Sequence, residues 1–272
     1  MAFRVGTLGD PNSGKSFAWT FFDKGEKAFA ICPSQKILHM RTSEGSLLKP
    51  LQIKVDGLNT EGQSTVNIIL KVLKDKIDPN KVKTIGNYII CSQVKKVSAI
   101  KQFVSRYMPD IRIIVTPDFT HYVSYIIQTP AFQARKSGGE AFARFWELAA
   151  DTLRSVILAS DNLREDLLDF TEFHSEYNGQ LDTYELFVPA GNMLKDKFKP
   201  MSYYDIMLCS YVTPFEDEKD ETKRFKFIVV NTGRHSGRGM NLFADIQKDG
   251  MIPNNMSLVV ERLVKYLGMP QI

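Results

Sequence analysis

The chain has 272 residues, of which 43% are hydrophobic and 24% are charged, and its formal net charge at pH 7 is +4. This composition excludes an intrinsically disordered chain, and a membrane-embedded class is excluded because no apolar stretch approaches the length of a membrane span. The small positive charge permits nucleic-acid binding without requiring it. We expect one domain over residues 1–272, located in the cytoplasm, because the first apolar run starts at once and leaves no room for a signal peptide.

A phosphate-binding loop directly follows the first predicted strand at residues 3–8. The next eight residues, Gly9-Asp10-Pro11-Asn12-Ser13-Gly14-Lys15-Ser16, match the G-x-x-x-x-G-K-S pattern in full. In this pattern the glycines let backbone amides approach a phosphate, the lysine lies beside the outer phosphates, and the Ser16 hydroxyl binds Mg²⁺. An apolar helix is expected at residues 17–22, beginning with Phe17. We therefore predict that residues 9–17 bind a nucleotide with Mg²⁺.

The rest of the chain alternates strand and helix patterns. Runs of β-branched and aromatic residues predict strands at 28–32, 51–55, 87–92, 111–116, 167–173, 204–212 and 225–231. Apolar residues at helical spacing predict helices at 66–77, 97–107 and 141–158. This alternation predicts an α/β fold with a mostly parallel central sheet flanked by helices.

Two features of the connections matter for this sheet. Only an acidic loop at 216–221 separates the last two strands, which predicts an antiparallel hairpin at the C-terminal edge. Long loops are expected at 128–139 and 175–183, and ligands bind beyond the carboxyl ends of strands in such sheets.

Polar residues at the ends of two predicted strands are candidates for the chemistry of a nucleotide site. Asp118 follows the strand at 111–116 and is the best acid for the metal side, although it also suits the N-cap of a following helix. His174 and Glu176 follow the strand at 167–173. If this strand neighbours the first, His174 senses the outer phosphate and Glu176 orients water, whereas a structural histidine is the simpler interpretation.

A glycine-rich turn after the last long strand carries Arg234 and Arg238. Arginine in such a turn can reach a phosphate bound by a neighbouring subunit and stabilise charge in the transition state. A solvated hairpin tip is the alternative. With Lys15, Asp118, His174 and Glu176, these arginines form the predicted catalytic set.

The order of these parts resembles the RecA-like P-loop ATPases. Within them it resembles a small phage-encoded group that acts in recombination and single-strand annealing, related in its core to RecA and to the DnaB-type helicase motor. The resemblance covers nearly the whole chain, and only the phosphate loop is specific on its own. It is carried by residues 9–16, Asp118 with 119–122, the helix at 140–159, His174-Ser175-Glu176, and the segments 234–243 and 252–255.

The resemblance implies a protein that binds and hydrolyses ATP and acts on single-stranded DNA in phage recombination or replication, in the host cytoplasm. It also implies a ring or filament of identical subunits, with the nucleotide at the subunit interface and a single-strand-binding protein as a partner. The loops that face DNA correspond to residues 128–139 and 175–182. Residues there with suitable charge or stacking surface are Phe132, Arg135, Lys136 and Tyr177.

The chain departs from this family at two positions. Pro117-Asp118 supplies a single carboxylate where the family usually has two acids. Residues 33–36, Pro33-Ser34-Gln35-Lys36, contain no acid where RecA relatives place a catalytic glutamate. The candidate substitutes are Glu44, Asp118 and Glu176.

These departures leave two alternatives to an active DNA-dependent ATPase. The missing acids favour an ATP-dependent switch, or an assembly or packaging component with weak hydrolysis. A nucleotide kinase shares the phosphate loop, but such kinases usually add an arginine-rich lid, and residues 135–139 carry few charges.

Overall fold

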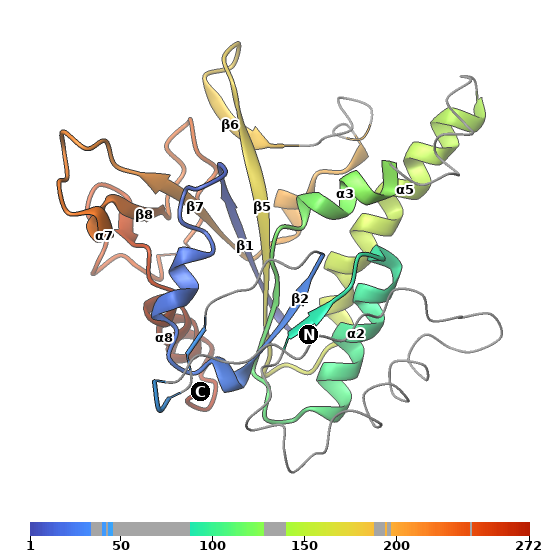
Figure 1. The fold of residues 1–272 in the computed structure, drawn as a ribbon, viewed down its shortest axis with the longest axis horizontal. Coiled ribbons are helices and arrows are strands. Elements are labelled where there is room, and N and C mark those ends of the chain that lie inside the picture. The colour runs from blue at the N-terminus through green and yellow to red at the C-terminus, as the bar shows by residue number, and fades with distance from the viewer. Residues whose placement is uncertain are drawn as a thin grey trace.

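The computed structural model describes residues 1–33, 40–41, 43–45, 88–127, 140–187, 194, 197–239 and 241–272. Within these residues the chain forms one nine-stranded sheet with the order β3-β2-β4-β5-β1-β7-β8-β9, and β6 pairs with β5 (Figure 1). The strands are β1 (Phe3–Gly9), β2 (Ala28–Cys32), β3 (Tyr88–Ile90), β4 (Ile113–Thr116), β5 (Leu168–Asn178), β6 (Thr183–Leu186), β7 (Ile206–Val212), β8 (Phe225–Ile228) and β9 (Met251–Pro253).

The helices differ in type and length. The α-helices are α2 (Val94–Tyr107), α3 (Thr120–Ile127), α5 (Glu140–Leu158), α7 (Glu221–Arg224) and α8 (Met256–Leu267). Short 3₁₀ helices are η1 (Phe17–Phe21), η2 (Gly25–Lys27), η3 (Ala159–Asn162) and η4 (Pro200–Tyr203). None of the described helices has the length and apolar character needed to cross a membrane.

The pairing confirms the predicted α/β class with a mostly parallel sheet. Strand β1 pairs in parallel with β5 on one side and with β7 on the other. Strands β2, β3 and β4 continue the parallel arrangement. Strand β8 runs antiparallel to β7, and β9 runs antiparallel to β8, so the predicted antiparallel hairpin at the C-terminal edge is present.

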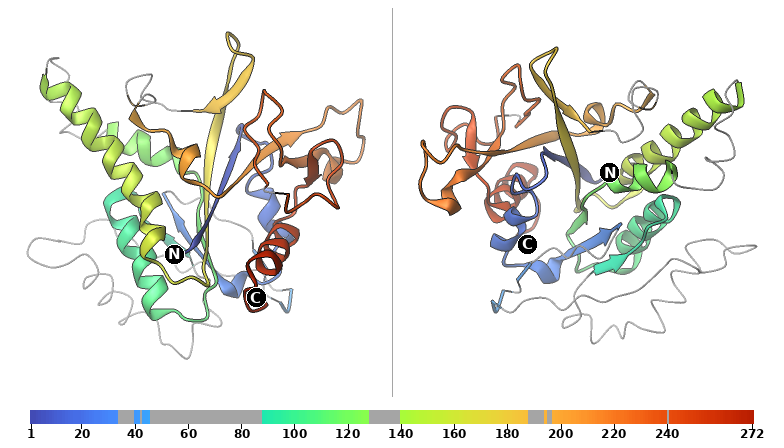
Figure 2. Two further views of the ribbon diagram at one scale, coloured as in Figure 1. Left: turned by 180° about the vertical axis from the view of Figure 1, so that it is seen from behind. Right: turned by 45° about the horizontal axis from the view of Figure 1, so that its top comes forward.

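Helices cover both faces of the sheet because its inner strands are apolar on both sides. Along β2, Phe29 and Ile31 pack into the core with α2, α3 and α5, whereas Ala28, Ala30 and Cys32 pack into the core with η1 and α8. The rear view in Figure 2 shows α2 and α5 on one side of the sheet and α8 on the other. The strands at 28–32, 111–116 and 204–212 are therefore correctly predicted from continuous apolar runs.

The predicted loop at 175–183 is wrong. Strand β5 continues to Asn178, and β6 pairs with it antiparallel, with Ser175 opposite Leu186 and Tyr177 opposite Tyr184. This hairpin projects beyond the other strands in Figure 1. Its residues from Thr183 onward are only half-buried, so they lack the apolar run by which the inner strands were recognised.

The predicted helix after the phosphate loop is a single 3₁₀ turn, η1, rather than an α-helix. Its sequence Phe-Ala-Trp-Thr-Phe is rich in aromatic residues, which favour α-helices weakly. The predicted helices at 97–107 and 141–158 are confirmed as α2 and α5. The predicted elements at 51–55 and 66–77, and the predicted loop at 128–139, lie outside the described residues.

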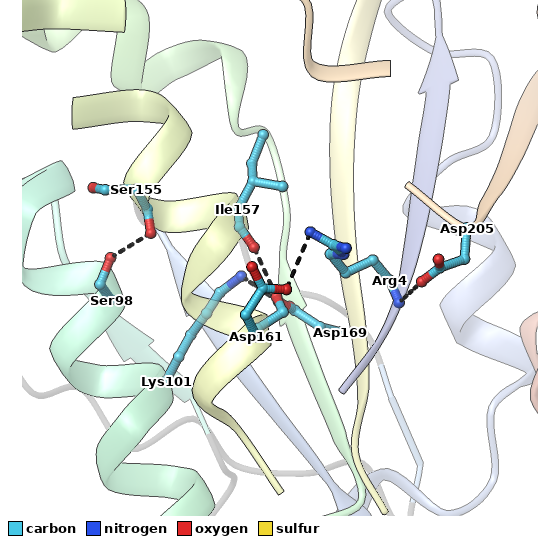
Figure 3. Close-up of polar contacts among 9 residues, drawn as sticks. Arg4, Ser98, Lys101, Ser155, Ile157, Asp161, Asp169 and Asp205 are labelled. Carbon is cyan, nitrogen blue, oxygen red and sulfur yellow. Dashed lines mark hydrogen bonds and ion pairs between the residues drawn. The ribbon is translucent and has the colours of Figure 1, made fainter. Parts of the chain in front are cut away.

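A buried ion pair ties α2 to the central strand β5. Nζ of Lys101 lies 2.9 and 2.6 Å from the two carboxylate oxygens of Asp169, and both side chains are at most 2% exposed. The Ser160 hydroxyl also donates to Asp169. Figure 3 shows Lys101 reaching this carboxylate between the helices and the sheet. Removal of either partner would leave an uncompensated buried charge. The pair therefore holds α2 against β5, the strand that carries His174.

Candidate functional site

The phosphate loop begins where the central strand β1 ends. Gly9, the last residue of β1, lies beside His174 of β5 in the parallel register, and Leu8 lies beside Cys209 of β7. The loop therefore leaves the sheet at its carboxyl edge, between β5 and β7. Ligands bind at this edge in open parallel sheets.

The loop conformation depends on its two glycines. A Cβ on Gly14, where φ is +94°, would lie 2.6 Å from the Phe225 ring, and a Cβ on Gly9 would lie 2.4 Å from Ser13 Oγ. Both distances are far below ordinary contact, so any other residue would displace its neighbours. Asn12 is also left-handed, with φ of 65°. Gly14 is thus favoured by its left-handed backbone, and Gly9 by the close approach of the Ser13 and Ser210 side chains.

Lys15 lies inside the loop rather than in solvent. Its Nζ donates to the backbone oxygens of Gly9 at 2.6 Å and of Asp10 at 2.8 Å, and the residue is 4% exposed. Ser13 is also buried, and its Oγ has no hydrogen-bond partner among the described residues. An ammonium group and a hydroxyl thus lie within the same backbone turn, and both can bind an oxyanion.

Ser16 and Phe17 form the start of η1. Ser16 precedes the helix with α-type backbone angles and makes no side-chain cap. The Phe17 ring packs against Phe225, with ring centroids 5.0 Å apart. Because η1 is one short turn, the helix contributes little dipole at the loop, and the backbone amides and Lys15 remain as the anion-binding groups.

A pocket of about 230 Å³ opens beside the loop on the β7 side. Asp10 forms part of its wall and accepts a hydrogen bond from the Ser175 hydroxyl. The rings of Tyr184 and His235, which also line the pocket, stack with centroids 4.6 Å apart. Burial lowers the pKa of His235; the charge of Asp10 opposes this effect and that of Arg234 adds to it. The pocket is therefore bounded by one end of the phosphate loop and by aromatic side chains.

Asp118 and His174 meet at the ends of β4 and β5. His174 Nε2 lies 3.3 Å from Asp118 Oδ1, and the Asp118 side chain is 2% exposed. Asp118 has a φ of 49°, which is rare for a residue other than glycine. The two residues that were predicted separately from strand ends are therefore in direct contact.

The other predicted acids, Glu176 and Glu44, come from two different segments. Glu176 is part of the β5–β6 hairpin, where it stands directly opposite Glu185. Glu44 is exposed in the short described segment at 43–45.

A third acid, Glu172, was not predicted as a site residue. It is 1% exposed on β5, beside Thr7 of β1, and accepts a hydrogen bond of 2.8 Å from Nε1 of Trp19 in η1. This contact connects the turn after the phosphate loop with the central strand. A carboxylate that interrupts an apolar strand at an inward-facing position is the signal by which sequence reasoning could have found it.

The two predicted trans-acting arginines have partners within the chain. The Arg234 guanidinium forms an ion pair with Asp182 in the turn between β5 and β6. Arg238 donates to the backbone oxygens of Met201 and Tyr204, and its own backbone bridges to Met207 of β7. Arg234 is thus exposed at a hairpin tip, whereas Arg238 links backbone segments.

Only one of the four predicted DNA contacts can be placed. Phe132, Arg135 and Lys136 lie outside the described residues. Tyr177 is 55% exposed on β5, its ring lies 5.4 Å from that of Tyr184, and its hydroxyl donates to Asp182. This hydrogen bond raises the pKa of Tyr177 and lowers that of Asp182. An aromatic surface is therefore available on the projecting hairpin.

Comparison with known proteins gives a distant structural similarity. No protein-family model matches the chain. No curated protein matches it in sequence. Among solved structures, the chain aligns with a prototypical ATPase from the type III secretion system of pathogenic bacteria, at 8% identity and a TM-score of 0.40. The alignment covers 83% of this chain and 56% of the chain of that ATPase.

Proposed function

We propose that this chain is a RecA-like P-loop ATPase that binds ATP with Mg²⁺ at the loop from Gly9 to Ser16. The observation that carries the proposal is the position of this loop. It leaves the central parallel strand at the carboxyl edge of the sheet and encloses the Lys15 ammonium. The buried Ser13 hydroxyl also fits an oxyanion, since it supplies a hydrogen-bond donor beside the loop backbone.

Each loop residue has a distinct role in this proposal. Lys15 exchanges its two backbone oxygen partners for phosphate oxygens, which are stronger acceptors because they are charged. Ser16 and Asp118 are the residues that would hold Mg²⁺, which neutralises charge on the transferring phosphoryl group when bound. Ser13 and the amides of the loop orient the phosphates.

Hydrolysis also needs a carboxylate that orients water. Glu176 was predicted for this role, and Glu172 is a further candidate. Glu172 is held by Trp19 on the strand next to β1, which suits an acid whose geometry must stay fixed. Glu176 lies further out along the same strand. The substitutions Glu172→Gln and Glu176→Gln distinguish the two candidates. Substitution of the residue that orients water should lower ATP turnover without weakening ATP binding, whereas substitution of the other should not.

The proposed role of the protein is ATP-dependent action on single-stranded DNA in phage recombination or replication, as a ring or filament in the host cytoplasm. The exposed Tyr177 supports this role by offering a stacking surface. Arg234 and Arg238 are proposed to reach the phosphates of a neighbouring subunit. A single-strand-binding protein is the proposed partner.

An ATP-dependent switch with weak hydrolysis is the second candidate, favoured by one observation. The only acid at the end of β4, Asp118, already faces His174. If this contact persists when ATP binds, the metal side of the site has lost its carboxylate and turnover would be slow. Such a protein would assemble with ATP without processing DNA.

Measuring ATP turnover on protein of known oligomeric mass, with and without single-stranded DNA, tests the proposal. We expect turnover that increases with DNA and disappears in Lys15→Ala and Asp118→Asn. Tight ATP binding without turnover or DNA binding would favour the switch. Absence of ATP binding would refute both candidates.

A further inference from the structure

Three groups that can bind metals converge at the ends of β4 and β5. Asp118, His121 and His174 each present one ligand atom, and these atoms all lie within 4.8 Å of one another. The chain has four histidines in total, so this cluster uses half of them. Asp118 lies in the turn from β4 into α3 and His121 in the first turn of α3, so both belong to one short segment, whereas His174 comes from β5.

Hydrogen bonds to β5 fix the turn that carries two of these groups. The Phe119 amide donates to the backbone oxygen of Glu172 at 2.8 Å, and the His174 amide donates to Thr120 Oγ1 at 3.0 Å. Within the turn, the His121 amide donates to the Asp118 backbone oxygen at 2.8 Å. The protein's own hydrogen bonds therefore hold the three groups together in the absence of an ion, as a prearranged metal site requires.

The burial of the three groups is graded. The side chain of Asp118 is 2% exposed and that of His174 is 17% exposed, whereas His121 is exposed. Nδ1 of His174 is buried and has no hydrogen-bond partner among the described residues, although Nε2 faces Asp118. The arrangement has an enclosed carboxylate at its base and an accessible imidazole at its mouth. Three protein ligands with one open side are typical of sites that also bind water or substrate.

The donor atoms indicate the class of ion. Mg²⁺ prefers an all-oxygen shell, whereas imidazole nitrogens suit Zn²⁺ and neighbouring transition metals. Two neutral imidazoles and one carboxylate carry a net charge of about −1, which favours a divalent cation. We propose that Asp118, His121 and His174 form a binding site for a divalent transition-metal ion of the Zn²⁺ type.

This site does not depend on the proposed nucleotide binding. It gives Asp118 a ligand role in the absence of ATP, separate from the Mg²⁺ role that we propose for Asp118 in the ATP complex. The backbone of His174 lies beside Gly9, where the phosphate loop begins. A cation held by His174 therefore adds positive charge at the edge of the sheet from which the loop leaves.

Metal titration of the full chain, purified without a polyhistidine tag and stripped with a chelator, tests the proposal. Zn²⁺ affinity is measured by competition with a chromophoric chelator, and Co²⁺ is used as a spectroscopic probe of nitrogen ligation. We expect one Zn²⁺ per chain and visible Co²⁺ bands. The variants His121→Ala, His174→Ala and Asp118→Asn should each weaken Zn²⁺ by at least about 100-fold, the upper end of the loss caused by removing second-shell partners.

The matched control is His235→Ala, which removes a histidine that stacks on Tyr184 outside the cluster. It should keep the Zn²⁺ affinity and the Co²⁺ spectrum of the original chain. Because Asp118 is buried, its variant can misfold; His121 is exposed, so His121→Ala provides the same test in a folded protein, verified by circular dichroism.

Two results would overturn the proposal. One is the absence of stoichiometric Zn²⁺ binding, and the other is Zn²⁺ binding that His121→Ala and His174→Ala leave unchanged. Lys15→Ala separates this proposal from the ATPase proposal, since it should weaken ATP binding at least about 10-fold and leave the Co²⁺ spectrum intact. A negative result for ATP binding therefore leaves the test of metal binding valid, and the reverse also holds.

Discussion

Arg234 Nε donates to Oδ2 of Asp182 at 2.8 Å, and Nη2 of the same guanidinium lies 2.7 Å from this oxygen as an ion pair. The other carboxylate oxygen of Asp182 accepts a hydrogen bond of 2.7 Å from the Tyr177 hydroxyl. The Tyr177 hydrogen bond and then the Arg234 guanidinium lower the pKa of Asp182. The glycine-rich turn that carries Arg234 is thus connected to the tip of the β5–β6 hairpin, and Arg234 must leave Asp182 before it can reach a neighbouring subunit.

The variants Arg234→Ala and Asp182→Ala distinguish two roles of Arg234, one in catalysis at a neighbouring subunit and one in holding the β5–β6 hairpin. If Arg234 stabilises the transition state across an interface, Arg234→Ala should lower ATP turnover by about 10³-fold or more, whereas Asp182→Ala should retain or raise it because the arginine is released. Steady-state ATPase rates at matched oligomer concentration provide the measurement. Equal losses in the two variants would mean that the ion pair only shapes the hairpin.

The folded protein should hold His235 neutral at pH 7. Burial lowers its pKa below the ordinary value of about 6.5, so the unfolded chain binds this proton more readily than the folded chain. The stability linked to neutral His235 is therefore fully present above about pH 6.5 and is lost as the pH falls through the folded pKa.

NMR titration of the imidazole protons, assigned with His235→Gln, should give a His235 pKa below about 6.5. The same variant should remove part of the decrease in stability on acidification. A His235 pKa at or above the ordinary value would show that the pocket does not desolvate this ring.

Removal of one partner of the Lys101–Asp169 pair should lower the stability of the fold strongly. Replacement of both partners by apolar residues should lower it much less. Lys101→Met leaves a buried carboxylate without its cation and should lower the free energy of unfolding by about 3–5 kcal/mol. The double variant Lys101→Met/Asp169→Leu should recover most of this loss, because no buried charge remains.

Denaturant unfolding of the single and double variants measures both values. The control is Lys197→Met, which breaks a partly exposed pair with Glu147 and should cost about 1 kcal/mol or less. A double variant less stable than Lys101→Met would contradict the interpretation that the uncompensated charge causes the loss.

Continuous apolar runs made the inner strands predictable. Strands β2 and β7 are buried on both faces, so their sequences contain an unbroken signal. Helix α8 also carries readable signals, although no helix was predicted there. Asn255 caps its first turn, apolar residues recur at helical spacing, and Gly268 ends it with φ of 63°.

The candidate site was predicted less completely because it depends on contacts between distant segments. Asp118 and His174 were recognised at strand ends, but periodicity encodes neither their contact nor the left-handed backbone of Asp118. His121 was passed over as the start of a helix. Glu172 lies within an apolar strand, and only the hydrogen bond from Trp19 in the structure made it a candidate.

The central claim is that the loop from Gly9 to Ser16 binds the phosphates of ATP. Equilibrium titration with a fluorescent ATP analogue and Mg²⁺, for the original chain and for Lys15→Ala, tests it most directly. Lys248→Ala serves as a control that removes an exposed lysine elsewhere. The original chain and Lys248→Ala should bind equally, and Lys15→Ala should bind at least about 10-fold more weakly, since a charged hydrogen bond contributes about 1.5–3 kcal/mol. Equal affinity of Lys15→Ala and the original chain, or no binding by either, would contradict the claim.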